Sequence, residues 1–168
     1  NPAGSFDPRR TLGDGIGESL RNRGMKKADI AIRVKELLEQ CGLEEELAKR
    51  YPHEVSGGQC QRAAIARALA VEPKVLICDE ATSALDVTVQ AQVVKQMMDL
   101  RDKMGTAIVI VTHNMGVASK MADYIAVMQN GELKEFGTRE QVIYHPENDY
   151  TKKLLTVVPK LQGETDGE

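Results

Sequence analysis

Two short segments of this chain carry residue types and spacings that suit phosphate and metal chemistry. The first is a Ser-Gly-Gly-Gln turn at Ser56–Gln59, and the second is the carboxylate pair Asp79 and Glu80 after an apolar stretch. A helix N-terminus presents unpaired N–H groups and a partial positive charge, so the turn suits a terminal phosphate. Paired carboxylates at a strand end suit a hydrated cation and an activated water. Together the segments indicate nucleotide hydrolysis.

The glycine turn has two interpretations. Gly57 and Gly58 lack a Cβ, so their amides can approach an anion closely, and Ser56 can add a hydroxyl donor. An ordinary N-cap followed by a tight turn explains the same residues about equally well. The turn alone leaves phosphate binding and simple capping both open.

The carboxylate pair is the more specific signal. Residues 75–78 are apolar and lead directly into Asp79 and Glu80. We expect this strand to end at the C-terminal edge of a sheet, where α/β folds bind their ligands. There Asp79 can hold Mg²⁺ through water, and Glu80 can act as the general base for an attacking water.

Histidines occur in three places, and one of them has a functional context. His113 follows the apolar run Thr106–Thr112, a position from which it can hydrogen-bond a phosphate and orient Glu80. His53 and His145 flank loops without such a context, so we interpret them as structural or solvent-facing.

The composition limits the class of protein. The chain has 168 residues, of which 42% are hydrophobic and 28% charged, with a net charge of −3. This length suits one domain with a moderate core, and the slightly acidic balance argues against a dedicated nucleic-acid binder. The longest apolar run, Ala107–Val111, is too short to cross a bilayer, and no secretory signal is recognisable. The three cysteines lack metal-ligand spacing and are expected to be buried thiols in a reducing compartment.

The periodicity of apolar residues predicts a helical block followed by an α/β core. Three segments have helical spacing: Ala28–Cys41, Gly57–Ala70 and Val87–Met104. Four runs are typical of strands: 75–78, 106–112, Tyr124–Met128 and Leu133–Phe136. The first two runs are continuous, which predicts strands buried on both faces of a parallel sheet, and Asn130-Gly131 predicts a hairpin turn between the last two. Thr11 with Asp14, and Thr138 with Gln141, fit helix N-caps.

Four motifs stand in a specific order: VSGGQ at 55–59, VLICDE at 75–80, SALD at 83–86 and THN at 112–114. This order resembles the ATP-binding subunit of an ABC transporter over essentially the whole chain. The resemblance implies an α/β fold, namely a partial RecA-like P-loop NTPase core with a mainly parallel sheet and flanking helices, plus an ABC helical subdomain. It places a loop and the helical signature subdomain at 1–56, the core with Walker B, D-loop and H-loop at 57–137, and a peptide-importer tail at 138–168.

The resemblance also implies a role for each motif. Residues of the signature turn would contact ATP held by the other subunit of a dimer: Ser56, Gly57, Gly58 and Gln59. Asp79 would be the Walker B aspartate that holds Mg²⁺, Glu80 the catalytic carboxylate and His113 the switch histidine. The D-loop at 83–86 would cross the dimer interface, with Asp86 as a further nucleotide-binding candidate. Val55 replaces the commoner leucine before the signature.

Finer details resemble the ATPases of peptide importers. These are the segment Tyr51–Glu54, the sequence LDVTVQAQ at 85–92 and the tail that begins with His145-Pro146. Related subunits serve dipeptides, oligopeptides and nickel, so the solute stays open. The implied partners are a second ATP-binding subunit, integral membrane permease subunits and, indirectly, an extracytoplasmic solute-binding protein, with no nucleic acid. The implied location is the cytoplasmic face of the cell membrane.

The 168 residues contain no Gly-x-x-x-x-Gly-Lys-Ser/Thr motif, which cradles the phosphates in this family. Gly13–Gly17 lacks the Lys-Ser/Thr and is expected to be helical. In relatives the Q-loop glutamine falls immediately before a segment resembling Asn1–Ser5. We therefore expect the latter part of an ATPase, which alone binds ATP poorly and does not hydrolyse it. The alternatives are a natural non-catalytic interaction module and a soluble ABC-type ATPase of translation or repair.

Overall fold

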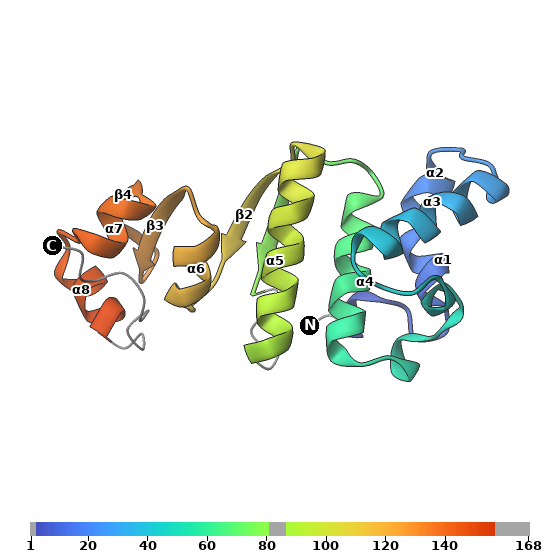
Figure 1. The fold of residues 1–168 in the computed structure, drawn as a ribbon, viewed down its shortest axis with the longest axis horizontal. Coiled ribbons are helices and arrows are strands. Elements are labelled where there is room, and N and C mark those ends of the chain that lie inside the picture. Colours follow the sequence, from blue (N-terminus) through green and yellow to red (C-terminus); the bar gives the residue numbers. More distant parts are fainter. Residues whose placement is uncertain (1–2, 81–86, 157–168) are drawn as a thin grey trace, which may run out of the picture. The chain divides into compact units, whose positions relative to one another are not determined.

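The computed structural model describes residues 3–80 and 87–156. The chain divides into two compact units, Asn1–Val111 and Thr112–Glu168. Each unit contains helices and a two-stranded sheet, β1-β2 in the first and β3-β4 in the second (Figure 1). No helix within the described ranges is long and apolar enough to span a lipid bilayer.

The first unit begins with a block of short helices, as the sequence predicts. The block comprises η1 (Ala3–Ser5), α1 (Leu12–Ile16), α2 (Glu18–Asn22), α3 (Lys27–Gln40), η2 (Glu45–Lys49), η3 (Pro52–Glu54) and α4 (Gly57–Leu69). Thr11 caps α1 by accepting a hydrogen bond from the amide of Asp14 at 3.2 Å, which confirms the predicted cap. Leu12, Leu37 and Leu38 are fully buried, so α1 and α3 contribute a common apolar core with α4.

The glycine-rich run Gly13–Gly17 lies in α1 and at its C-cap. A Cβ placed on Gly13 would lie 2.8 Å from the carbonyl oxygen of Ala48, and one on Gly15 would lie 2.6 Å from the ring of Phe6. Such distances exclude a side chain, so these glycines allow close packing of α1 against its neighbours. The run is helical, as predicted, and is explained without a phosphate.

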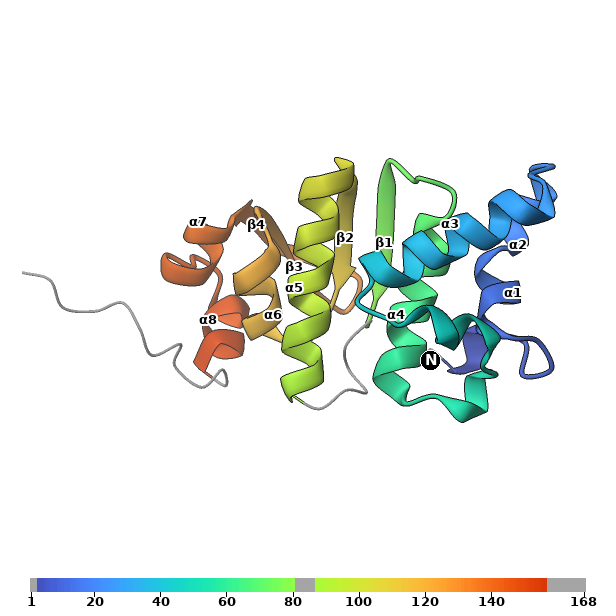
Figure 2. The ribbon, with the colours of Figure 1, turned by 45° about the vertical axis from the view of Figure 1, so that its right-hand side comes forward.

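Strands β1 (Val75–Asp79) and β2 (Ala107–Val111) pair in parallel, with Asp79 opposite Val111. They are joined through α5 (Val87–Met104), which lies alongside the pair (Figure 2). The predicted parallel pairing is confirmed, with strand ends that differ from the prediction by at most one residue.

The prediction that these strands are buried on both faces is wrong. Leu76 and Cys78 are buried, but Val75 and Ile77 alternate with them and are 54% and 70% exposed. Successive side chains of a strand point to opposite faces, and within the described residues only one face of the pair is covered. The continuous apolar sequence therefore leaves one apolar face open to solvent.

The second unit is built on the hairpin of β3 (Tyr124–Gln129) and β4 (Glu132–Thr138). Asn130 and Gly131 both have positive φ, 51° and 80°, as the predicted hairpin turn requires. Helices α6 (Met115–Met121), α7 (Arg139–Tyr144) and α8 (Asp149–Thr156) surround the hairpin. Thr138 caps α7 in a reciprocal capping box with Gln141, which confirms the second predicted cap. A small core of Ile125, Val127 and Val142 holds the unit together.

Glu135 of β4 connects the hairpin to the C-terminal helix. Its carboxylate accepts hydrogen bonds from the amides of Glu147, at 2.9 Å, and Asn148, at 3.3 Å, just before α8 begins. Burial alone raises the pKa of Glu135, but hydrogen bonds to the charged form, with the two amides among the donors, outweigh it and lower the pKa. The charged form of Glu135 thus binds the backbone directly before α8.

We expect Glu135→Gln to destabilise the second unit near neutral pH by about 1 kcal/mol, because hydrogen bonds to a charged group are replaced by weaker ones. A carboxyl group with a lowered pKa stabilises the fold above its unfolded pKa, and that contribution disappears as the pH falls through the folded pKa. The melting temperatures of the wild type and the variant should therefore converge when the pH falls below the ordinary pKa range of glutamate. A difference that persists unchanged in acid would contradict this account. Glu132→Gln, on the same strand, is the control.

Candidate functional site

The Ser-Gly-Gly-Gln turn forms the first turn of α4. The Oγ of Ser56 accepts a hydrogen bond from the amide of Gln59 at 3.2 Å, and the Oε1 of Gln59 accepts one from the amide of Ser56 at 2.9 Å. This capping box satisfies the amide of Gln59 and that of Ser56 itself. Within the part of the chain that the structure describes, the amides of Gly57 and Gly58 donate to no acceptor. Capping and anion binding are therefore compatible in this turn.

Gly57 is not explained by the packing of the chain. It is exposed, its φ is not positive, and a Cβ placed on it would have no atom within 4 Å. Glycine within a helix is about 1 kcal/mol less favourable than alanine, so the fold gains nothing from it there. The other glycines with open space around them, Gly24, Gly105 and Gly131, have positive φ. The absence of a side chain at Gly57 suits a group that approaches the amides from outside.

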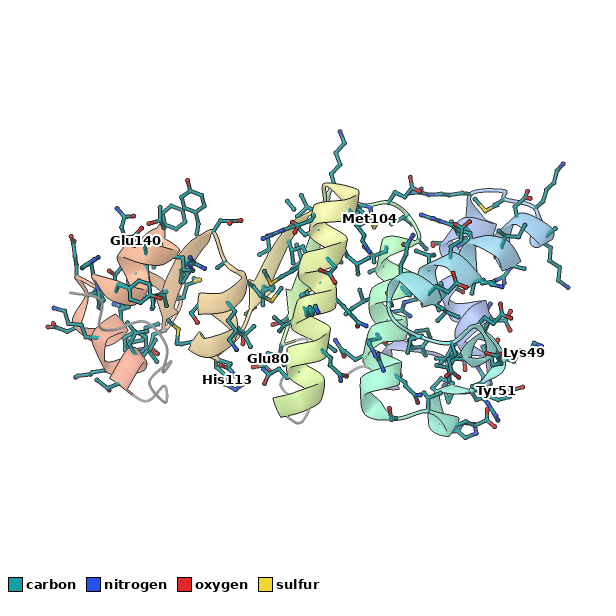
Figure 3. The ribbon with its side chains drawn as sticks, viewed as in Figure 1. Lys49, Tyr51, Glu80, Met104, His113 and Glu140 are labelled. Carbon is teal, nitrogen blue, oxygen red and sulfur yellow. The ribbon has the colours of Figure 1, made fainter. Side chains whose placement is uncertain are left out.

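The carboxylate pair lies where β1 ends. Asp79 is the last residue of the strand and is exposed. Glu80 follows it, and its side chain is also exposed (Figure 3). The amide of Glu80 donates to the carbonyl of Val111 at 2.9 Å, which extends the parallel ladder by one bond. Both carboxylates thus lie at the carboxyl end of a parallel strand pair, as predicted.

Glu80 has a left-handed backbone conformation, with φ of 47°. This conformation costs a non-glycine residue about 1–2 kcal/mol. The pattern of apolar residues gives no sign of it, because it arises where the chain turns away from the sheet. A strained residue at a strand end that carries a carboxylate is typical of functional sites.

The carboxylates fit one particular kind of metal site. Across residues 3–80 and 87–156, no three His, Cys, Asp or Glu side chains are grouped so that they could hold a metal ion. A protein cage for a cation is therefore not formed by the described residues. Mg²⁺ that arrives with phosphates commonly uses one or two carboxylates and keeps several waters. The exposed Asp79 carboxylate suits that arrangement.

His113 lies in the second unit, in the turn between β2 and α6, and its side chain is exposed (Figure 3). The neighbouring Asn114 caps α6, its Oδ1 accepting hydrogen bonds from the amides of Gly116 at 2.9 Å and Val117 at 3.3 Å. The Thr112 hydroxyl oxygen accepts from the amide of Asn114 at 3.0 Å. Hydrogen bonds of Thr112 and Asn114, the two neighbours of His113, therefore fix the turn that carries it.

The structure assembles the predicted site only in part. It places Ser56–Gln59 in one turn, and Asp79 beside Glu80, all within the first unit. His113 belongs to the second unit, so its action on Glu80 stays a prediction. Asp86 and the rest of the D-loop lie outside the described residues.

One residue near the turn was given no role from the sequence. Arg62 donates its Nε–H to the carbonyl of Gly58 at 3.3 Å and an Nη1–H to the carbonyl of Gly42 at 3.1 Å. An arginine in a helix is ordinary, and Gly42 is 20 residues away in the sequence. Only the folded structure brings these groups together.

Residues 5–83 match the family model described as ABC transporter. The structure is similar to that of the ATP-binding cassette MJ0796, solved as a dimer in a post-hydrolysis state with ADP and phosphate. The TM-score is 0.71 at 31% identity, over 80% of this chain and 59% of that one. A second dimeric structure of MJ0796, described as a bacterial ABC transporter cassette, gives the same values. The chain is therefore similar to the ATP-binding cassettes of ABC transporters, and the predicted α/β cassette fold is confirmed.

Among curated proteins, the chain is similar to the glutathione import ATP-binding protein GsiA. It is 48% identical over 160 residues to GsiA of Salmonella typhimurium strain LT2 and of Escherichia coli strain K12, a match that covers 95% of this chain. The chain spans about a quarter of the length of these relatives, since the match covers 26% of each.

Proposed function

We propose that this chain is the latter part of the ATPase subunit of an ABC importer, which couples ATP hydrolysis to the uptake of peptides or a related solute. The observation that carries the proposal is the open glycine turn: Gly57 has no packing role, and its amide and that of Gly58 donate to no acceptor among the described residues. The exposed pair Asp79 and Glu80 at a strand end supports the same chemistry. The name of the relative, a glutathione import protein, supports a small peptide-like solute.

In this proposal the signature turn binds the terminal phosphate of ATP held by a second ATP-binding subunit. The amides of Gly57 and Gly58 point at the anion, and the partial positive charge of the helix N-terminus favours it. Because the Ser56 oxygen accepts from Gln59, its proton remains to be donated to a phosphate oxygen.

The strand end supplies the remaining groups. Asp79 holds Mg²⁺ through water, and the ion, when bound, neutralises charge on the phosphates. Glu80 accepts a proton from the attacking water, and His113 hydrogen-bonds the phosphate and orients Glu80. Asp86 contributes from the D-loop at the subunit interface.

The partners we propose follow from the importer assignment. They are a second ATP-binding subunit, integral permease subunits and, indirectly, an extracytoplasmic solute-binding protein, with the ATPase on the inner face of the membrane. The dimeric solved cassettes support the first partner. Co-purification of the full-length gene product with an integral permease, and permease-dependent uptake of labelled glutathione or a dipeptide, test the proposal. A full-length product that hydrolyses ATP without any permease partner would point to a soluble ATPase instead.

We expect the 168 residues alone to bind Mg²⁺-ATP weakly, with no saturable heat below about 1 mM in calorimetry. The reason is that they contain no Gly-x-x-x-x-Gly-Lys-Ser/Thr segment to cradle the phosphates. The matched control is the same chain extended by the coding region upstream of Asn1. Tight Mg²⁺-dependent binding by the 168 residues would contradict the expectation.

A further inference from the structure

Two consecutive glycines open α4, and they need support to keep one conformation. Glycine loses more backbone freedom on folding than any other residue, so a Gly-Gly turn is intrinsically mobile. The capping box between Ser56 and Gln59 provides one support. A second support comes from Arg62, one turn further along the helix.

Arg62 acts on the peptide unit between Gly58 and Gln59. Its Nε–H donates to the carbonyl oxygen of Gly58 at 3.3 Å. The amide N–H of Gln59, at the opposite edge of the same planar unit, donates to Ser56 Oγ at 3.2 Å. A peptide unit is planar, so contacts at its oxygen and its nitrogen set one orientation. The Arg62 contact thereby also bears on where the Ser56 hydroxyl lies.

The other end of the guanidinium contacts a second segment of the chain. An Nη1–H of Arg62 donates at 3.1 Å to the carbonyl of Gly42, just past the C-cap of α3. Gly42 has φ of 64°, and a Cβ placed on it would lie 2.2 Å from Nε2, at the end of the Gln96 side chain of α5. The left-handed conformation at this position favours glycine, and Arg62 ties the glycine turn to the backbone just past α3.

We propose that Arg62 is a positioning residue for the phosphate-binding turn. It touches no phosphate itself. It holds the Gly58 carbonyl, and through that peptide unit the Ser56 hydroxyl, in the orientation that receives the anion. This proposal rests on the proposed function of the turn.

The test uses the full-length gene product. Arg62→Ala should lower kcat at saturating ATP by about tenfold, because a small misplacement of a positioning group has a large effect on rate. Equilibrium binding of ATP to the monomeric subunit should change by less than about twofold, since the turn serves ATP held by the other subunit. Arg62→Lys, whose single ammonium lacks the forked geometry that reaches both carbonyls, should give an intermediate kcat.

Arg33→Ala is the matched control. Arg33 is a half-buried arginine that pairs with Glu36 of its own helix and with Glu72 in the loop after α4, at 2.9 Å each, and these contacts do not involve the glycine turn. Its loss should reduce stability without lowering kcat per folded molecule. The amide resonances of Gly57 and Gly58 should shift in Arg62→Ala and stay in place in Arg33→Ala.

Three results separate the possibilities. A wild-type kcat and unshifted glycine resonances in Arg62→Ala, together with an inactive Gly57→Ala, would overturn the positioning role and leave the proposed function standing. Full turnover in both variants would overturn the proposed function as well. If Arg62→Ala does not fold, kcat per folded molecule of Arg62→Lys decides: a reduced value supports the proposal, and a wild-type value overturns it.

Discussion

Glu80→Gln is expected to abolish ATP turnover in the full-length subunit, by at least about 100-fold, while ATP binding stays close to that of the wild type. Glutamine has nearly the same size and can still accept a hydrogen bond, but it cannot take a proton from water. Glu80 lies at the end of β1 with its side chain exposed, which suits such a role. Phosphate release and nucleotide binding, measured on the same preparation, check the prediction.

Two further variants separate chemistry from backbone effects. Glu72 is also exposed and has a positive φ of 51°, so Glu72→Gln repeats the substitution at a similar backbone site away from the strand end. It should leave turnover unchanged. Glu80→Gly should relieve the strain of φ 47° by about 1 kcal/mol and yet remain inactive. Turnover near the wild-type level in Glu80→Gln would show that another group is the base.

Gly57→Ala should remove most ATP turnover and leave the fold as stable as before, or slightly more stable. Alanine is the better helix former, and a methyl group at this position meets no described atom within 4 Å outside its own helical turn. The same methyl group would obstruct a phosphate that must approach the amides closely. Loss of one preorganised hydrogen-bond donor to developing negative charge lowers kcat by about 10²–10³-fold.

The contrast with Gly15→Ala makes this prediction specific. A Cβ on Gly15 would lie 2.6 Å and 2.8 Å from two atoms of the Phe6 ring, so overpacking should destabilise the fold by about 1–3 kcal/mol. Thermal unfolding together with turnover per folded molecule distinguishes the two glycines. If Gly57→Ala unfolded more easily and kept its turnover, the open turn would have a structural role rather than a binding role.

Much of the local structure follows from patterns within a few residues of each other. Apolar spacing located α3, α4, α5 and the four strands, because the period of side-chain burial differs between helices and strands. Thr11 and Thr138 were recognisable as caps because a cap acts on an amide three residues away. Asn130-Gly131 was recognisable because few residue pairs accept two positive φ values.

Features that depend on long-range packing were not predictable in this way. A continuous apolar strand predicts two covered faces, yet Val75 and Ile77 are exposed. Burial depends on which other segments reach each face, and no local pattern records that. Glu80, which has a positive φ, likewise makes a long-range contact, because its amide donates to Val111, 31 residues further on.

The sequence by itself indicated the class of protein, because Ser56–Gln59, Asp79, Glu80 and His113 occur in an order and spacing that resemble the ATP-binding cassettes. Whether the glycine turn only caps a helix was left open. The tertiary structure shows that capping leaves room for binding: the capping box leaves two amides unused among the described residues, and a Cβ on Gly57 would meet no described atom outside its own helical turn. It also brought Arg62 to Gly58 and Gly42. Space and hydrogen-bond satisfaction are properties of all the atoms around a residue, which only the folded chain defines.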